Sequence, residues 1–546
     1  MSRNNRKGSS QGFRLSRRQL IQSAALAAGA AFIDIPAFAQ SGVGATVETL
    51  YGKIRGKVNI GIHSFKGIPY GASTAGVNRF MPTVKPQPWT GVRDAFEFGH
   101  QSPQNMRYTE VLSPQADPNE GFDEDCLVLN VWTPEANDSR KRPVMFWCHG
   151  GGFAQESGSW PWIDGEALAR RGDMVVVTIN HRLNIFGYLH LGDIGGEKYA
   201  ASGNAGMLDL VAGLEWVRDN IVQFGGDPDN VMIFGESGGG AKVCSLLAMP
   251  AAKGLFHRAA IQSGSWLRVT PREEADELAR TLLNELGIHA NNIDNLQKVP
   301  VAEILAASTG AMNVVPGRHG EVRLGFSPVL DGKIMPSHPF DPVATPISAD
   351  IPLMVGCTQH ESTLFYLPDE AAYKLDDAGL RTRIIEMLGD TDGKRAIDIY
   401  KAAHPNAGAS EVFFLITSDR LMRRDVITLA ERKVEQGRAP VYMYYFTWRS
   451  PAQGGRLGAT HTVEIPFVFD NTHIPTVMTK APTAKALAAK TSEAWIAFAR
   501  SGDPNHAGLP NWPVYDSDRR ATMVFNNTCE VISDPESAGR KFWQGV

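Results

Sequence analysis

A serine with the surroundings of a nucleophile stands near the middle of the chain. Residues 235–239 read G-E-S-G-G and match the pattern G-x-S-x-G, with Ser237 at the centre. A serine on a sharp strand-to-helix turn projects its hydroxyl above a sheet, and glycines on either side relieve the crowding of that turn. The bare pattern is common by chance in a glycine-rich chain, so the flanking elements decide its interpretation.

A run of three glycines upstream could bind a developing negative charge. Residues 149–153 read H-G-G-G-F and directly follow the apolar run 144–148. Glycine N–H groups can point at a ligand oxygen without obstruction by side chains. We expect the N–H groups of Gly151, Gly152 and Gly238, the residue after the serine, to hold an oxyanion. The alternative is an ordinary flexible turn.

The elements that would position these residues alternate between strands and helices. Apolar runs at 144–148, 174–179 and 231–234 are typical of strands buried on both faces of a parallel sheet, and 353–355 and 441–446 suit later strands. Residues 208–221 have a helical pattern, and D-P-D-N at 227–230 predicts a break before the next strand. Residues 270–310 and 369–435 are helix-rich, which indicates insertions over the sheet. The pattern predicts one α/β domain over residues 40–546.

Composition excludes several classes of protein. The chain has 546 residues, of which 43% are hydrophobic and 21% charged, and these values argue against disorder. A net charge of −4 offers no basic face for nucleic acid. The five cysteines form no C-x-x-C pair, which argues against a zinc ribbon or a dense disulfide scaffold. Nothing in the sequence predicts a metal or a cofactor, and nothing in it bears on the oligomeric state.

Residues 1–39 have the layout of an export signal. Basic residues crowd positions 3–18, an alanine-rich apolar run follows at 24–33, and A-F-A at 37–39 is a cleavage signal. Arg17 and Arg18 precede the apolar run, which is typical of a twin-arginine (Tat) signal peptide. No apolar run reaches the ~20 residues that a membrane span needs, so we expect no stable membrane anchor. The sequence predicts a periplasmic or secreted protein.

Chemistry alone leaves the catalytic base and acid open. A serine hydroxyl becomes a good nucleophile only when a base removes its proton. Several histidines after Ser237 could serve, and the acid that orients the base could be any of many carboxylates. The histidine candidates are His257, His289, His319, His338, His360, His404, His461 and His473.

Further motifs resemble the type-B carboxylesterase/lipase family of α/β-hydrolases, which also contains cholinesterases and the non-catalytic neuroligins. They include F-K-G-I-P-Y at 65–70, E-D-C-L-V-L-N-V at 124–131, F-G-G-D-P at 224–228 and A-I-Q-S-G-S at 260–265. Together with the stretches around residues 356–361 and 461–469, these motifs run from near the start of the predicted mature chain almost to its end. The resemblance implies an α/β-hydrolase fold: a mostly parallel central sheet, helices on both faces and helical insertions over the active site.

The resemblance also implies particular site residues. The family's acid ends a G-x-x-x-x-E stretch, here 356–361, which implies Glu361; its base lies shortly before E-I-P-F-V-F at 464–469, which implies His461. The order Ser237, Glu361, His461 agrees with the family's chain order. Ser263 would be a hydroxyl near the glutamate, or else a simple turn serine. Glu236 would tune the site, or else be a solvated turn residue.

The implied activity is hydrolysis of a small or medium-sized carboxylic ester through an acyl-enzyme. Amide or carbamate cleavage by the same triad is an alternative, and a non-catalytic binding protein of the neuroligin type is disfavoured because the serine is present. Choline esters are disfavoured because residues 113–120 hold no aromatic residue where the family's cholinesterases carry a tryptophan. Aromatic residues that could line the substrate pocket, or simply belong to the core, are Phe153, Trp160, Trp162, Phe365 and Tyr366.

One cysteine departs from the family pattern. In many exported relatives the cysteine of E-D-C, here Cys126, forms a disulfide with a cysteine shortly upstream. In this chain Ser102 stands where that partner would be. A Tat substrate folds before export in a reducing cytoplasm, where disulfides rarely form. Both observations predict five free thiols.

Overall fold

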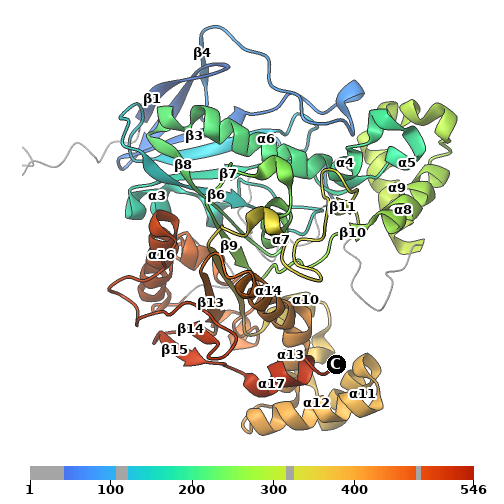
Figure 1. Ribbon diagram of the computed structural model, residues 1–546, viewed down its shortest axis with the longest axis vertical. Helices are drawn as coiled ribbons and strands as arrows, with labels where there is room; N and C mark the ends of the chain where they lie inside the picture. The colour runs from blue at the N-terminus through green and yellow to red at the C-terminus, as the bar shows by residue number, and fades with distance from the viewer. Residues whose placement is uncertain (1–41, 106–120, 315–324, 475–480) are drawn as a thin grey trace, which may run out of the picture.

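The computed structural model describes residues 42–105, 121–314, 325–474 and 481–546 (Figure 1). The predicted signal peptide, residues 1–39, lies outside the described residues. The described residues contain no helix with both the length and the apolar character that a membrane span requires.

One large sheet forms the centre of the molecule. From edge to edge its strands run β1-β2-β3-β5-β7-β6-β8-β9-β12-β13-β14-β15, and β4 pairs with β2. The strands from β7 to β14 in this order are parallel to one another, whereas β5 pairs antiparallel with β7, β15 pairs antiparallel with β14, and β1, β2, β3 and β5 pair antiparallel along the other edge. The bounds are β1 Gly42–Thr49, β2 Gly52–Asn59, β3 Ile62–Pro69, β4 Val92–Asp94, β5 Val128–Thr133, β6 Arg142–Cys148, β7 Val175–Ile179, β8 Gly226–Glu236, β9 Arg258–Gln262, β12 Leu353–Thr358, β13 Val441–Phe446, β14 Ala521–Phe525 and β15 Glu530–Ser533; β10 Thr270–Pro271 pairs with β11 Val329–Leu330 apart from this sheet.

Helices cover both faces of the sheet (Figure 1). Along β6, Val144 and Phe146 pack into one hydrophobic core with Leu214 of α6, while Met145 and Trp147 pack into a second core. The alternation of side chains along a strand sends successive residues to opposite faces, so an all-apolar strand needs helices on both. The helices are α3 Glu166–Gly172, α4 Asn184–Tyr188, α5 Gly192–Gly195, α6 Ala205–Asn220, α7 Gly238–Leu247, α8 Arg272–Glu285, α9 Val301–Val314, α10 Glu361–Phe365, α11 Asp377–Leu388, α12 Asp390–Ala403, α13 Ala409–Ser418, α14 Arg424–Glu435, α15 Ile465–Val468, α16 Ala484–Ser501 and α17 Ser537–Trp543.

The predicted elements are present, with one correction. The apolar runs form β6, β7, β8, β12 and β13, and the helical pattern forms α6. The predicted break at residues 227–230 is wrong, because these residues belong to β8. Arg142 of β6 pairs with Gly226, and Val144 pairs with Val231, so the chain between Gly226 and Val231 bulges out of the ladder without ending the strand.

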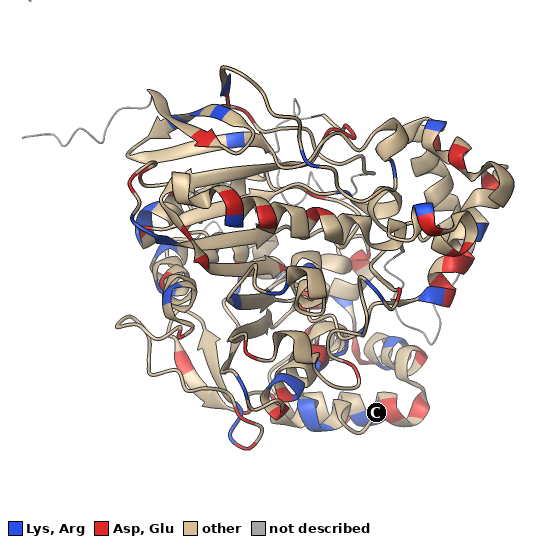
Figure 2. Ribbon diagram, turned by 45° about the horizontal axis from the view of Figure 1, so that its top comes forward, with Lys and Arg blue, Asp and Glu red and all other residues tan. Residues whose placement is uncertain are grey.

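The helix-rich stretches are insertions between neighbouring strands. Helices α8 and α9 lie in the connection from β9 to β12, and α11 to α14 lie in the connection from β12 to β13. In Figure 1, α8 and α9 lie at one side of the sheet and α11, α12 and α13 lie together at its lower end. Figure 2 shows that charged residues of both signs lie mainly on such outer helices and loops, whereas the central strands carry few.

All five cysteines are free and buried. Burial raises the pKa of Cys148 and of Cys244 to about 12, so neither thiol ionises at neutral pH. Thiolates are the reactive form, and these side chains therefore act as small hydrophobic groups within the core.

We predict that Ellman's reagent detects five thiols in the unfolded, non-reduced mature protein and reacts only slowly with the native one. Dithiothreitol should leave the melting temperature unchanged, because there is no cross-link to remove; a lost disulfide would cost ~2–4 kcal/mol. A cross-linked peptide containing Cys126 in non-reducing mass spectrometry would contradict the prediction.

Candidate active site

Ser237 occupies a strained turn between β8 and α7. Its φ of 56° and ψ of −123° lie outside the regions that residues with a side chain readily adopt. The turn is tied to the neighbouring strand, because the Ser237 N–H donates to the carbonyl of Gln262 at 2.8 Å. Such strain persists only where the surrounding structure enforces it, and it is common at functional sites. The half-buried serine thus stands at the carboxyl end of β8.

The glycine run and the serine turn are in direct contact. A Cβ atom on Gly238 would lie 2.2 Å from the carbonyl oxygen of Gly152 and 2.4 Å from its nitrogen, so only glycine fits there. Gly151 and Gly152 have φ values of 72° and 62°, which favour glycine as well. No described residue accepts a backbone hydrogen bond from the N–H of Gly151 or Gly152. The predicted oxyanion-binding groups are therefore brought together.

Glu361 and His461 form a buried pair. Glu361 begins α10 directly after β12, and His461 precedes α15 in the segment that follows β13. The Nδ1 of His461 lies 2.5 Å from Oε2 of Glu361, and both side chains are almost fully buried. A charge-assisted bond of this length fixes both the orientation of the imidazole and the nitrogen that carries the proton.

Two further donors hold the other carboxylate oxygen of Glu361. The Ser263 hydroxyl donates to Oε1 at 2.5 Å, and the Thr358 N–H donates to the same oxygen at 2.7 Å. Ser263 thus lies beside the glutamate, where the resemblance put it. These two bonds leave Oε2 to the histidine alone.

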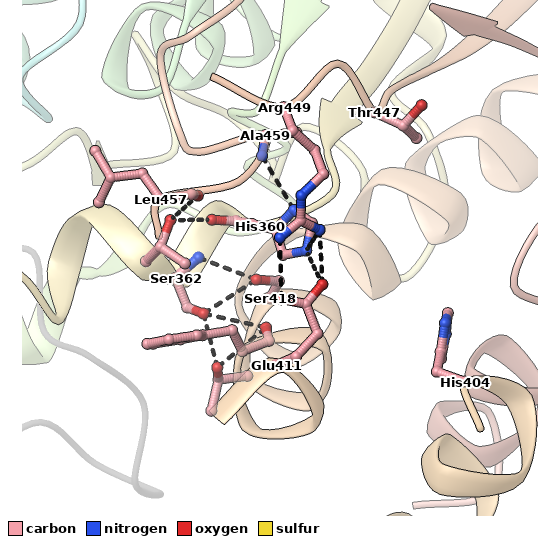
Figure 3. Close-up of polar contacts among 12 residues, drawn as sticks. His360, Ser362, His404, Glu411, Ser418, Thr447, Arg449, Leu457 and Ala459 are labelled. Carbon is pink, nitrogen blue, oxygen red and sulfur yellow. Dashed lines mark hydrogen bonds and ion pairs between the residues drawn. The ribbon is translucent and has the colours of Figure 1, made fainter. Parts of the chain in front are cut away.

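A polar network around His360 joins the two chain segments that carry Glu361 and His461 (Figure 3). The N–H of Ala459 donates to Nδ1 of His360 at 3.1 Å, so Nε2 of that ring carries the proton and faces Oε1 of Glu411 at 2.8 Å. Arg449 donates to the same carboxylate at 2.7 Å. His360 and Ala459 lie one and two residues from Glu361 and His461, so this network fixes the spacing between the two chain segments.

The second ring nitrogen of His461, Nε2, lies near Glu236. This nitrogen lies 3.4 Å from Oε1 of Glu236, and within the described part of the chain it has no hydrogen-bond partner. His461 is therefore placed next to the serine turn through Glu236, the residue that precedes Ser237, and its Nε2 makes no hydrogen bond to Ser237. Catalytic contacts are often long in a free enzyme and tighten when substrate binds.

Three more carboxyl groups surround the histidine, and burial raises the pKa of each. The pKa of Glu236 is raised well above its usual value, by burial and then by the negative charges of Glu464 and Glu361. Burial, followed by the charge of Glu361, raises the pKa of Glu464 to about 8, and burial raises that of Glu156 to about 7. At neutral pH the Glu464 carboxyl is therefore mostly protonated, and the raised pKa of Glu236 favours its neutral form as well, which reduces the number of like charges around one imidazole.

The comparison with known proteins identifies the family. The model of the carboxylesterase family matches residues 44–543. The chain belongs to the carboxylesterase family. It is 37% identical to para-nitrobenzyl esterase of Bacillus subtilis over 91% of this chain and 97% of the relative, and 34% identical to phenmedipham hydrolase of Pseudarthrobacter oxydans over 89% and 96%. A crystal structure of a Geobacillus stearothermophilus carboxylesterase matches with a TM-score of 0.78 at 41% identity, covering 91% of this chain and all of that one.

The aromatic candidates of this carboxylesterase divide into two groups. Trp160 and Trp162 stack on each other inside the core, and Phe153 is equally buried against Tyr188. By contrast, Phe365 is 45% exposed, and its ring centre lies 5.0 Å from that of His461. Tyr366, the next residue, packs against Phe413 and Phe414 of α13. Phe365 is thus the one of the five that lies against the histidine and also faces solvent. Residues 113–120, on which the argument against choline esters rests, lie outside the described residues.

Sequence reasoning missed several residues around this carboxylesterase site. Glu464 accepts a hydrogen bond from the Tyr444 hydroxyl at 2.8 Å, and Gln262 contacts the same carboxyl at 3.3 Å. Lys242 is fully buried on α7. The sequence did offer a signal for Lys242, because a lysine in the helix after the serine turn is expected to be buried there and buried lysines need specific partners. The described residues contain no cluster of three or more His, Cys, Asp or Glu side chains that could hold a metal.

We predict that Glu361→Gln lowers kcat by ~10⁴ while the protein stays folded, because an amide cannot stabilise an imidazolium or fix its tautomer. Glu464→Gln is the matched control: the carboxyl is buried nearby but is already neutral, so the amide should change kcat little. Steady-state kinetics and circular dichroism of both variants check the assignment. A large loss in the Glu464 variant with none in the Glu361 variant would reverse it.

Proposed function

We propose that this carboxylesterase hydrolyses small or medium-sized carboxylic esters with Ser237, His461 and Glu361 as a catalytic triad, through an acyl-enzyme. The observation that carries the proposal is the buried Glu361–His461 bond beside the strained turn at Ser237. A carboxylate that holds one imidazole nitrogen leaves the other nitrogen to act as a base toward a nearby hydroxyl.

Acylation begins when Nε2 of His461 removes the proton of Ser237 while Oγ bonds to the ester carbonyl carbon. The carbonyl oxygen becomes negative and is held by the N–H groups of Gly151, Gly152 and Gly238. Collapse of this intermediate breaks the bond to the alcohol oxygen, which takes the proton from His461. Water then attacks the acyl group by the same steps, and Ser237 regains its proton as the carboxylic acid leaves.

The surroundings of Glu236, which disfavour its charged form, support this role of His461. A negative Glu236 only 3.4 Å from Nε2 would form an ion pair with the protonated imidazole and hold it away from the leaving alcohol. Burial raises the pKa of Glu236 well above its usual value and so disfavours this negative form, which supports Glu361 as the carboxylate that stabilises the imidazolium.

Relatives and geometry together suggest a first substrate. The relative from Bacillus subtilis is named for para-nitrobenzyl esters, and in this chain the exposed ring of Phe365 lies against His461. An apolar or aromatic group beside the scissile bond would pack on that ring. We therefore propose para-nitrobenzyl and p-nitrophenyl esters of varied acyl length as the assay series.

Ser237→Ala should abolish hydrolysis of these esters. Loss of a triad serine in enzymes of this type costs roughly 10⁶ in kcat. A fluorophosphonate probe should label the wild type at Ser237 and leave the variant unlabelled, while both keep the same circular dichroism. A variant that retains a tenth of the activity would remove Ser237 from the mechanism.

We further propose that residues 1–39 direct export through the twin-arginine pathway to the periplasm or beyond. Replacing Arg17 and Arg18 by lysine should leave uncleaved precursor in the cytoplasm, since the paired arginines are the address that this pathway reads. Immunoblots of cell fractions check this outcome. Normal export of the double variant, blocked only when the Sec pathway is disabled, would contradict it.

A further inference from the structure

Lys242 is buried beside the glycine run and binds its carbonyl oxygens. The residue lies in the first half of α7, and its side chain is 0% exposed. Its Nζ donates to the carbonyls of His149 at 2.8 Å, Gly150 at 3.2 Å and Gly152 at 2.7 Å. A buried ammonium without partners is very costly, and here each of its three N–H donors has an acceptor. Burial lowers the pKa of Lys242 to about 8, so it still carries its proton at neutral pH.

Peptide planarity connects these bonds to the oxyanion-binding groups. In a trans peptide the carbonyl and the following N–H point in opposite directions. When Lys242 holds the carbonyl of Gly150, the N–H of Gly151 must point away from the ammonium. The carbonyl of Gly151 is held separately by the N–H groups of Ala154 at 3.2 Å and Gln155 at 3.1 Å, which orients the N–H of Gly152.

The same bonds also change the strength of these donors. A carbonyl that accepts a hydrogen bond polarises its peptide, and the N–H of that peptide becomes a better donor. The bond from a charged ammonium is the stronger kind. The Gly151 N–H therefore gains both direction and strength from a residue that does not touch the substrate.

We propose that Lys242 is a positioning residue for the oxyanion-binding turn: its Nζ, bonded to the carbonyls of His149, Gly150 and Gly152, holds the glycine run in the conformation that presents its N–H groups to the tetrahedral intermediate. The inference rests on the proposed function of Ser237. It assigns Lys242 no proton transfer and no contact with substrate. Loss of the ammonium should therefore weaken binding of the oxyanion and leave binding of the neutral ester intact.

The chain supplies a matched control for a merely structural role. Lys433 on α14 is only 3% exposed, and its Nζ donates to the carbonyls of Ser348 at 2.7 Å and Ala349 at 2.8 Å and to Gln436 at 3.0 Å. Burial lowers its pKa to about 8, as for Lys242. None of its acceptors belongs to a segment that carries a site residue. Lys433→Met thus removes an equivalent buried ammonium away from the glycine run.

The test compares Lys242→Met with Lys433→Met in the full mature protein. Stability is measured as the melting temperature, and the final fraction of protein labelled by a fluorophosphonate reports the amount of active protein. Catalysis is measured as kcat and KM for a para-nitrobenzyl ester. Binding is measured as the inhibition constants of a trifluoromethyl ketone and of its methyl ketone analogue. The first ketone forms an oxyanion on Ser237, whereas the second binds mainly as a neutral ground-state mimic. Both variants should melt lower than the wild type.

Only Lys242→Met should lose catalysis. Removing one oxyanion donor costs ~10²–10³ in kcat in enzymes of this kind, so we expect a loss of about 10² with KM changed less than about threefold. The trifluoromethyl ketone should bind about 10²-fold more weakly, and the methyl ketone equally well. Equal losses in the two lysine variants, or parallel changes for the two ketones, would overturn the proposal.

A second variant covers the case in which Lys242→Met does not fold. Lys242→Arg keeps the charge, but its planar guanidinium cannot direct three donors from one atom. It should reduce the preference for the trifluoromethyl ketone by about tenfold, and an unchanged preference would overturn the proposal. A wild-type protein that the fluorophosphonate fails to label would instead contradict the proposed function itself.

Discussion

The strained turn with positive φ at Ser237 is the constraint on which the arrangement of the site depends. A backbone with φ of 56° between a strand and a helix survives only if neighbouring chain segments pack against it closely. This close packing is possible because the residues in contact are glycines. A Cβ on Gly238 would collide with Gly152, and one on Gly264 would lie 2.1 Å from the carbonyl oxygen of Ser237. The glycines around the serine therefore allow three segments to meet at backbone distance.

Electrostatics imposes a second constraint, because three fully buried carboxyl groups and the half-buried Glu156 lie around His461. Full ionisation would place Glu156, Glu236, Glu361 and Glu464 side by side in a medium of low dielectric constant. Burial resolves this conflict by raising the pKa of Glu236 and Glu464, while Glu361 is held by donors from Ser263 and the backbone. What distinguishes Glu361 from the equally buried Glu236 and Glu464 is therefore its set of hydrogen bonds to Ser263, Thr358 and His461.

Much of the fold was readable from the sequence, because strands buried on both faces leave continuous apolar runs such as residues 144–148 and 441–446. The irregular start of β8 could not be predicted from the sequence, because Asp227 and Pro228 are typical of turns and the bulge depends on pairing with β6. Local motifs indicated Ser237 and the glycine run. His461 and Glu361 needed a family resemblance, because residues 100 positions apart meet only in the folded chain. Lys242 was missed although its place in the helix after the serine turn offered a signal, and Glu464 was missed because its raised pKa depends on burial, which no local pattern displays.

The two helical insertions begin and end on neighbouring strands: β9 and β12 bracket one, and β12 and β13 bracket the other. Because the ends of each insertion are held by a ladder that exists without it, lengthening the segment between them costs little, about 0.6 kcal/mol for each doubling of a flexible loop. The sheet can therefore keep its register while the outer helices change in length, except where an insertion supports the site, as α13 does through the contact of Glu411 with His360.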